Sequence, residues 1–254
     1  MKADKHLCLL YVSACFGTLV VFVASMTAWL YWDKALNTCQ YNELDLSRNC
    51  GCILYSKWGD SFIKGGDVRI CYFAVLSPVP IIIWTAFYAL YHGYRSFCTT
   101  TKVKVTLITK NGVDAVNTQL WSRPILIFAI ILCVLSSVLL FSEGVIVTDG
   151  YLKTCDQYKK SLVKELSASG ALAKAIHDRI PCEALYDFLD YLQPDPPTLE
   201  DKYRRGAWRI QTNIVLTMSI YGSWVCFVIL IFLTVLNIRC IKIPRKRPIL
   251  NTSL

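Results

Sequence analysis

Hydrophobic residues in this chain are concentrated in four long stretches. They cover residues 7–32, 70–94, 124–142 and 210–238, and together they contain no Lys, Arg, Asp or Glu. About 20 apolar residues suffice to cross the hydrocarbon core of a bilayer. A backbone in lipid must satisfy its own hydrogen bonds, so runs of this length are expected to be helices. The pattern predicts an all-α membrane protein with four transmembrane helices, and residues 1–254 form a single membrane domain.

The polar segments between these stretches differ in charge. Residues 1–6, 95–123 and 239–254 hold twelve basic and two acidic residues, whereas 33–69 and 143–209 hold fifteen basic and sixteen acidic ones. Basic residues collect on the cytoplasmic side of membrane proteins. We therefore predict that both termini and the 95–123 loop are cytoplasmic, and that the two longer loops are extracellular. Topology then accounts for the net charge of +9, and a nucleic-acid-binding surface is not needed to explain it.

The twelve cysteines divide evenly under this topology. Six lie in the predicted outer loops or at the outer membrane face, where an oxidising environment favours disulfides: Cys39, Cys50, Cys52, Cys71, Cys155 and Cys182. Cys155–Cys182 is the simplest pair and would contribute on the order of 3 kcal/mol. The alternative joins Cys50 and Cys52 to Cys155 and Cys182, and zinc at Cys50-Gly-Cys52 is disfavoured because no paired His accompanies it. These cysteines predict a disulfide-braced extracellular cap on a four-helix bundle.

Cysteines and basic residues at the predicted inner face are candidates for lipid contacts. Cys98 and Cys240 follow the second and fourth stretches and are plausible palmitoylation sites, with an unmodified thiol as the alternative. The tail carries a cluster expected to contact anionic lipids, at about 1 kcal/mol per residue near the surface. Its members are Arg239, Lys242, Arg245, Lys246 and Arg247. The sequon at Asn251 lies on the same predicted side and is expected to stay unglycosylated.

Patterns inside the stretches indicate how they pack. Small residues recur along one face of each stretch, which favours packing within the chain, with a homodimer interface as the alternative. On the first stretch they are Ser13, Gly17, Ala24 and Ala28. Aromatic residues at its outer end, Trp29, Tyr31 and Trp32, predict part of an interfacial belt. Pro78 and Pro80 should bend or break the second stretch.

The loops carry weaker signals. The first outer loop is expected to form short extended pieces and turns, one of them at Gly65-Gly66. Two stripes with helical spacing follow Cys155 and Cys182 in the second outer loop, and we expect them to cover the bundle rather than to bind a partner. The alternation in Lys102–Val105 indicates a small hairpin or, equally, a flexible linker.

Motifs for catalysis are missing from the sequence. It contains no Walker loop, dinucleotide fingerprint, HExxH or nucleophile elbow, and its three histidines lie in different segments. We therefore predict no enzymatic activity, no cofactor and no metal site. Glu143 directly follows the third stretch, at its outer end. It could line an ion path, although solvation or pairing with Arg209 is the favoured interpretation.

Four short motifs extend this interpretation: Cys52-Ile-Leu-Tyr55, Cys71-Tyr-Phe73, Thr154-Cys155-Asp156 and Cys182-Glu183. In order and placement the chain resembles the transmembrane protein 179 family of four-span proteins, relative to which Cys39 and Cys50 are extra. The resemblance implies four helices and a plasma-membrane or endomembrane setting, and it implies no catalytic residue. Claudin-like and tetraspanin signatures are absent from the outer loops.

These observations favour a protein that acts by binding. We expect a multi-pass accessory or scaffold protein that contacts other membrane proteins laterally or through its extracellular loops, with membrane lipids around it and no nucleic acid. The alternative is a subunit of a channel or transporter. Glu143, the bent second stretch and Cys50-Gly-Cys52 motivate that alternative, and large-pore channels of the calcium-homeostasis-modulator type are similar in carrying Cys-x-Cys before the second span. The oligomeric state is left open.

Overall fold

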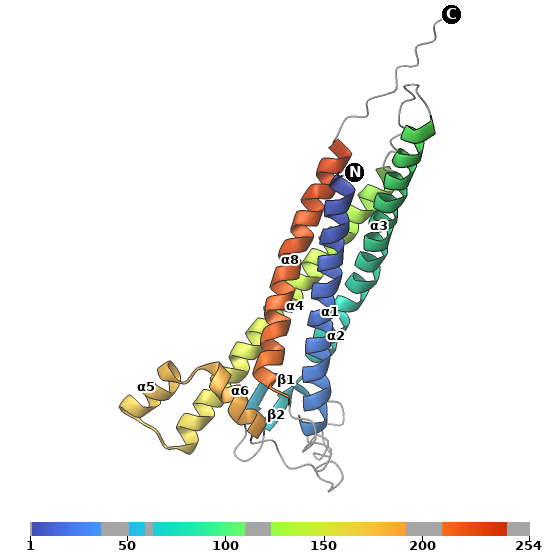
Figure 1. The fold of residues 1–254 in the computed structure, drawn as a ribbon. Coiled ribbons are helices and arrows are strands. Elements are labelled where there is room, and N and C mark those ends of the chain that lie inside the picture. Colours follow the sequence, from blue (N-terminus) through green and yellow to red (C-terminus); the bar gives the residue numbers. More distant parts are fainter. Residues whose placement is uncertain (1, 37–50, 59–62, 110–122, 192–209, 243–254) are drawn as a thin grey trace, which may run out of the picture. The chain divides into compact units, whose positions relative to one another are not determined.

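The computed structural model describes residues 2–36, 51–58, 63–109, 123–191 and 210–242, apart from some side chains near the ends of these ranges. The elements, in order, are α1 (Lys2–Leu36), β1 (Cys52–Trp58), β2 (Ile63–Gly66), α2 (Val68–Leu76), α3 (Pro78–Thr109), α4 (Arg123–Glu165), α5 (Gly170–Arg179), α6 (Cys182–Tyr191) and α8 (Thr212–Lys242) (Figure 1). Four helical stretches are long and apolar enough to cross a membrane: Lys5–Asp33, Val68–Ser96, Pro124–Glu165 and Thr212–Ile241. The prediction of an all-α membrane protein is thus confirmed in part: the described residues are mostly helical and include four membrane-length helical stretches, and they also contain two short strands.

Two helices extend beyond their predicted ends. Helix α4 does not stop at residue 142 but continues to Glu165. Ion pairs one turn apart, Asp149–Lys153 at 2.9 Å and Asp156–Lys160 at 2.6 Å, fit this extension. Helix α3 continues to Thr109, so both the hairpin and the flexible linker predicted for 102–105 are wrong. Extending an existing helix adds one hydrogen bond per residue, whereas a hairpin must be nucleated separately.

The second stretch is interrupted as predicted. Helix α2 ends at Leu76, Ser77 is its C-cap, and α3 starts at Pro78. Proline has no N–H, so Pro78 and Pro80 cannot donate to the carbonyl groups four residues earlier. The break therefore lies inside a segment that is otherwise long enough to span a membrane.

The buried residues of the long helices recur every three or four positions. On α1 they include Leu7, Tyr11, Ala14, Thr18, Val21, Ser25, Ala28 and Trp32. On α8 they include Thr212, Leu216, Ser219, Ser223, Cys226, Leu230, Leu233 and Asn237. This heptad spacing is typical of helices that pack along one another at shallow angles. The buried face includes serine, threonine and asparagine, which in lipid are held at helix contacts by hydrogen bonds.

Two predictions for the first stretch have different outcomes. In the predicted stripe of small residues, Ala24 and Ala28 are buried, whereas Ser13 and Gly17 are half-buried. The prediction that Trp32 belongs to an interfacial belt is wrong. Trp32 is fully buried and donates its Nε1–H to Thr212 Oγ1 at 2.8 Å. It is therefore a core residue, because its indole N–H finds a partner inside the protein rather than at a lipid interface.

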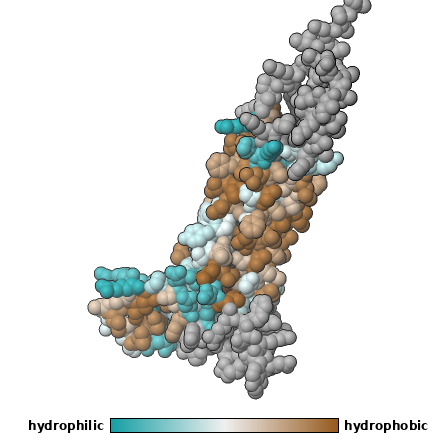
Figure 2. All heavy atoms as spheres, in the orientation of Figure 1, coloured by the Kyte–Doolittle hydropathy of each residue, from teal (hydrophilic) through white to brown (hydrophobic). Residues whose placement is uncertain are grey.

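Large apolar side chains cover the other faces of these helices. Leu9, Leu90 and Tyr221 are at least two-thirds exposed. Figure 2 shows hydrophobic residues over most of the visible helical surface. Such a surface suits lipid better than water.

Internal contacts divide the chain into two compact units. The first unit contains residues 1–16, 81–138 and 226–254, and the second contains 17–80 and 139–225. Helices α1, α4 and α8 contribute to both units. The second unit holds the strands, the disulfides and a core built around Trp32, Ile53 and Tyr186.

In the second unit, β1 and β2 form an antiparallel hairpin, which confirms the predicted extended pieces. The pairing is irregular between Cys52 and Lys57, and Tyr55 within this stretch has φ 60°. A residue in the left-handed region is typical of a bulge that redirects a strand. Gly66 lies in β2 rather than in the predicted turn, and glycine is required there because an added Cβ would clash with the Leu54 carbonyl oxygen.

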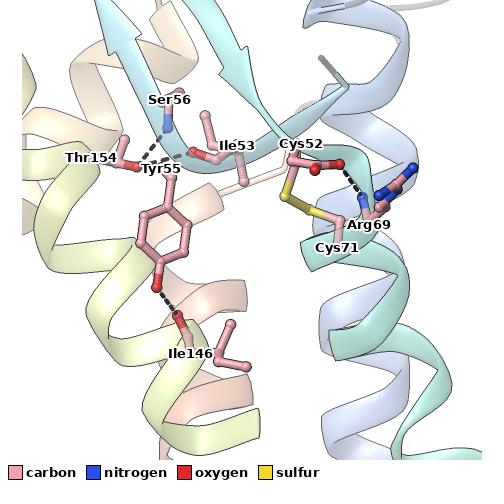
Figure 3. The surroundings of a disulfide bond; sticks show 9 residues. Cys52, Ile53, Tyr55, Ser56, Arg69, Cys71, Ile146 and Thr154 are labelled. Atoms are coloured by element: carbon pink, nitrogen blue, oxygen red, sulfur yellow. Dashed lines mark hydrogen bonds between the residues drawn. A yellow bond between two sulfur atoms is a disulfide. The ribbon is translucent and has the colours of Figure 1, made fainter. Parts of the chain in front are cut away.

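Thr154 of helix α4 binds backbone groups on both sides of the bulge. Thr154 Oγ1 accepts a hydrogen bond from the Ser56 backbone N–H at 3.2 Å and donates to the Ile53 carbonyl at 3.1 Å (Figure 3). The hydroxyl thereby satisfies two backbone groups near the bulge. Next to it, a Cβ on Gly150 would lie 2.9 Å from the Tyr55 ring, so glycine lets the strand approach the helix.

Two disulfides flank this contact. Cys52 of β1 is bonded to Cys71 of α2, and Cys155 of α4 to Cys182 of α6. The predicted Cys155–Cys182 pair is confirmed. The alternative that joined Cys52 to the second loop is wrong, because the hairpin brings Cys52 back to the start of α2.

Replacing Thr154 by valine tests this contact. Thr154→Val keeps the shape but leaves the buried Ser56 N–H without its acceptor, which should lower the free energy of unfolding by about 1–3 kcal/mol. The measurement is unfolding of the purified protein in mixed micelles by denaturing detergent. Thr154→Ser retains the hydroxyl and should lose clearly less. Equal losses in both variants would show that the methyl group, not the hydroxyl, matters.

Candidate functional sites

Glu143 is the most unusual side chain of the second unit. It is fully buried, and it is the only Asp, Glu, Lys or Arg among the buried residues of the described segments. Ser77 Oγ donates to its Oε2 at 2.7 Å, whereas its Oε1 has no hydrogen-bond partner within the described part of the chain. Pairing with water or with Arg209 was the favoured interpretation. The carboxyl is buried away from the protein surface, and Arg209 lies outside the described residues.

The partner of Glu143 sits at the break in the second stretch. Ser77 donates its backbone N–H to Phe73 O at 3.0 Å, which ends α2. Pro78 and Pro80 then leave the carbonyl groups of Ala74 and Leu76 without their usual helical donors. The break thus combines a buried carboxyl, a hydroxyl and backbone oxygens that a continuous helix would have used.

A small cavity lies close by along the same helices. Its volume is about 10 Å³, which is about the space that one water molecule needs. The cavity is lined by Ala74, three residues before Ser77, and by Val147, one turn after Glu143. It also meets Trp29, whose Nε1–H has no partner among the described residues, and the Ser25–Ser219 hydroxyl pair, 2.8 Å apart.

The first unit contains a separate polar cluster. Asn237 Nδ2 donates to the Tyr11 hydroxyl at 2.9 Å and lies 4.0 Å from Cys133 Sγ. The Tyr11 ring stacks on His92 with a centroid distance of 5.5 Å and an interplanar angle of 5°. Tyr11, His92, Cys133 and Asn237 come from four different helices and are all buried. Such a cluster is well suited to fix how helices pair in lipid.

The second unit also carries a helical projection, which we call the arm. The arm comprises residues 155–182: the end of α4, helix α5 and the connection to α6, closed at its base by Cys155–Cys182. Ile176 of α5 is buried, and Lys159 Nζ donates to the His177 carbonyl at 3.0 Å. These contacts hold α5 against the end of α4.

The tip of the arm has a defined turn. Ser167 adopts φ 46°, and its N–H donates to Lys164 O while the Ala168 N–H donates to Val163 O. This pair of bonds is a Schellman motif, which ends a helix by satisfying its last carbonyl groups. Leu166 and Leu172 flank the turn and are 57% and 55% exposed. Figure 2 shows hydrophilic residues along one edge of the arm and hydrophobic residues over the rest of its visible face.

Helix α6 is anchored by aromatic and acidic side chains. Tyr186 stacks on Tyr151 at 4.6 Å, and burial raises the pKa of its hydroxyl. Asp190 accepts the Thr212 backbone N–H at 2.8 Å and so caps the first turn of α8. Burial raises the pKa of Asp190, and the hydrogen bonds from Thr212 oppose this shift. On the hairpin, burial and then the hydrogen bond to Asp149 raise the pKa of Tyr55 to about 12.

The two stripes predicted in the second outer loop differ in their contacts. Leu185 and Leu189 on α6 are buried, so this stripe packs on the core as expected. The stripe after Cys155 does not, because Leu166 is exposed and Leu162 only half-buried. The long extension of α4 carries this stripe away from the core.

Several predicted lipid-contact and disulfide residues lie outside the described segments. They are Cys39, Cys50, Arg245, Lys246, Arg247 and the side chains of Cys98 and Lys242. Arg239 is exposed and Cys240 half-buried near the end of α8. Lipid contact and lipidation at these positions stay predictions.

Sequence reasoning missed Thr154, the cluster around Asn237 and the capping role of Asp190. Asn237 could have been noticed as a strongly polar residue in an apolar stretch, at heptad spacing from Leu230 and Leu233. Thr154 gave no comparable signal, because its partners are backbone groups of a distant strand.

Comparisons with known proteins supply no further assignment: no family model, no curated protein and no solved structure matches this chain.

Proposed function

We propose that this integral membrane protein is an accessory or scaffold protein that uses the arm to contact another membrane protein. The proposal rests on the exposed pair Leu166 and Leu172 at the tip of a helical projection that a disulfide closes. Hydrophobic residues that remain exposed on a rigid element are a common feature of protein-binding surfaces. We also propose that the chain is related to the transmembrane protein 179 family, which it resembles in four short motifs.

The proposed topology puts the arm and the hairpin outside the cytoplasm. Disulfides form and persist in oxidising compartments, and both pairs lie in the predicted outer loops or at their borders. The basic termini and the 95–123 segment then face the cytoplasm. On this basis we propose the plasma membrane or an endomembrane of the secretory route as the location of the protein.

The arm is suited to binding because little of it needs to rearrange. Its base is covalently closed, its turn is fixed by two backbone bonds, and α5 is held by Ile176 and Lys159. A preorganised surface loses less conformational entropy when it binds. The stripe that was expected to cover the bundle is thus the better candidate for a contact surface.

A subunit of a channel or transporter is the second candidate. The buried Glu143 beside a broken membrane-length segment favours it, because ionisable groups in such segments often mark ion or proton pathways. Conductance of reconstituted protein that disappears with Glu143→Gln would support this candidate over the accessory role.

The proposed topology predicts the outcome of a glycosylation experiment. Ser167→Asn completes a sequon with Ala168 and Ser169 at the exposed tip, and asparagine tolerates the left-handed conformation there. We expect a glycosidase-sensitive increase in mass for this variant. The wild-type sequon at Asn251 is the internal control and should stay unmodified. Modification at Asn251 without modification at residue 167 would reverse the topology.

The contact itself can be tested by photo-crosslinking in intact cells. A photo-reactive side chain at Leu172 should give a discrete adduct with a membrane protein, whereas one at the exposed Lys174 on the same helix should give little or none. Leu166→Ser combined with Leu172→Ser should prevent co-purification of the partner identified in that adduct, and Lys174→Ser should not. The same adducts from both positions, or none from Leu172, would contradict the proposal.

A further inference from the structure

If Glu143 were ionised, it would carry a buried negative charge that no opposite charge among the described residues compensates. Moving an ionised carboxylate out of water costs several kcal/mol even after the protein relaxes, unless an opposite charge compensates it. Glu143 is fully buried, and within the described residues it receives one hydrogen bond, from the neutral Ser77 hydroxyl. One hydrogen bond to a charged group returns about 1.5–3 kcal/mol.

The surrounding elements bring no compensating charge within the described segments. Ser77, the C-cap of α2, donates to the carboxyl. Helix α8 presents Ser223 and Trp224 beside Gly144, which follows Glu143 along α4. None of these side chains is charged or titrates near neutral pH. The nearest acid along α4, Asp149, pairs with Lys153 at 2.9 Å.

We propose that Glu143 and Ser77 form a binding site for a small monovalent cation, either a proton or an alkali ion. A proton and an alkali ion would each bring a single positive charge to the unpartnered Oε1. A proton would convert the carboxylate to a neutral acid. An alkali ion would be coordinated by the carboxylate, the Ser77 hydroxyl and the carbonyl groups that lack helical donors at the proline break. Discontinuous helices of ion-coupled transporters bind ions in a similar way.

The donor set argues against a divalent ion. Ca²⁺ takes six to eight oxygen ligands and Mg²⁺ a near-ideal octahedron, usually with more negative charge than one carboxylate supplies. The inference needs neither a partner at the arm nor transport of the ion.

The test uses full-length protein in nanodiscs of phosphatidylcholine and infrared difference spectroscopy of carboxyl groups. Choline chloride provides ionic strength without an alkali ion, and pH is raised from acidic to alkaline. We expect the carbonyl band of a protonated carboxylic acid to disappear as pH rises. Glu143→Gln should remove this band from the difference spectrum, whereas Asp149→Asn, an acid-to-amide change at a more exposed position of α4, should leave it.

A second part of the experiment distinguishes the two cations. At fixed acidic pH, choline is replaced by sodium or potassium. Loss of the band on this exchange identifies an alkali ion that displaces the proton, and an unchanged band identifies the proton alone. Ser77→Ala removes the hydrogen bond to Oε2 and should shift the pH midpoint of the band. This variant retains Glu143 and therefore tests the site even if Glu143→Gln fails to fold.

The proposal is overturned if wild-type protein gives no carboxyl band that responds to pH or alkali ion, or if the band persists unchanged in folded Glu143→Gln protein. A midpoint that is unaffected by Ser77→Ala would remove Ser77 from the site. Because these readouts come from the carboxyl itself, they are independent of the outcome of crosslinking at the arm.

Discussion

The attachment of the β1 strand to helix α4 determines the arrangement of the second unit. A bulged strand leaves backbone groups without ladder partners, and burying them unpaired would cost about 1–3 kcal/mol for each group. Thr154 satisfies two of these groups from the side of the helix, and Gly150 gives the Tyr55 ring room to lie against it. Cys52–Cys71 and Cys155–Cys182 then fix the strand to α2 and the helix to α6.

The same requirement for internal partners runs through the long helices. Trp32 donates to Thr212, Ser25 pairs with Ser219, and Asn237 donates to Tyr11. Each pair joins two helices at buried positions, where water cannot replace a lost bond. Glu143 differs from these pairs because it is a carboxyl group, and one of its two oxygens has no partner within the described segments. This contrast makes the carboxyl a candidate for ligand binding rather than for packing.

Much of the membrane-length helical fold could be predicted because it depends on local composition. Uncharged stretches marked the spans, and Pro78 and Pro80 marked the break. The end of α4 could not be predicted, because residues after Glu143 are polar enough to resemble a loop while the helix still buries Val147 and Thr154. The site at Glu143 was visible as an acid near a span, but its burial depends on where the broken helix places Ser77.

The disulfide bonds, too, could be predicted from the sequence only in part. Cys155–Cys182 could be proposed because the two residues flank one segment, whereas Cys52–Cys71 required the hairpin that returns the chain to α2. Cys39 and Cys50 lie outside the described residues, so their pairing is not part of this arrangement. The exposed tip at Leu166 could not be anticipated either, since an apolar stripe looks the same whether it is covered or not.

The most direct test of this arrangement is a disulfide map of the full-length protein, obtained by mass spectrometry of peptides prepared without reduction. The account predicts one cross-linked pair that contains Cys52 and Cys71 and a second that contains Cys155 and Cys182. A bond from Cys52 to Cys155 or to Cys182 would contradict it, because β1 could not then lie against α4 as Thr154 requires.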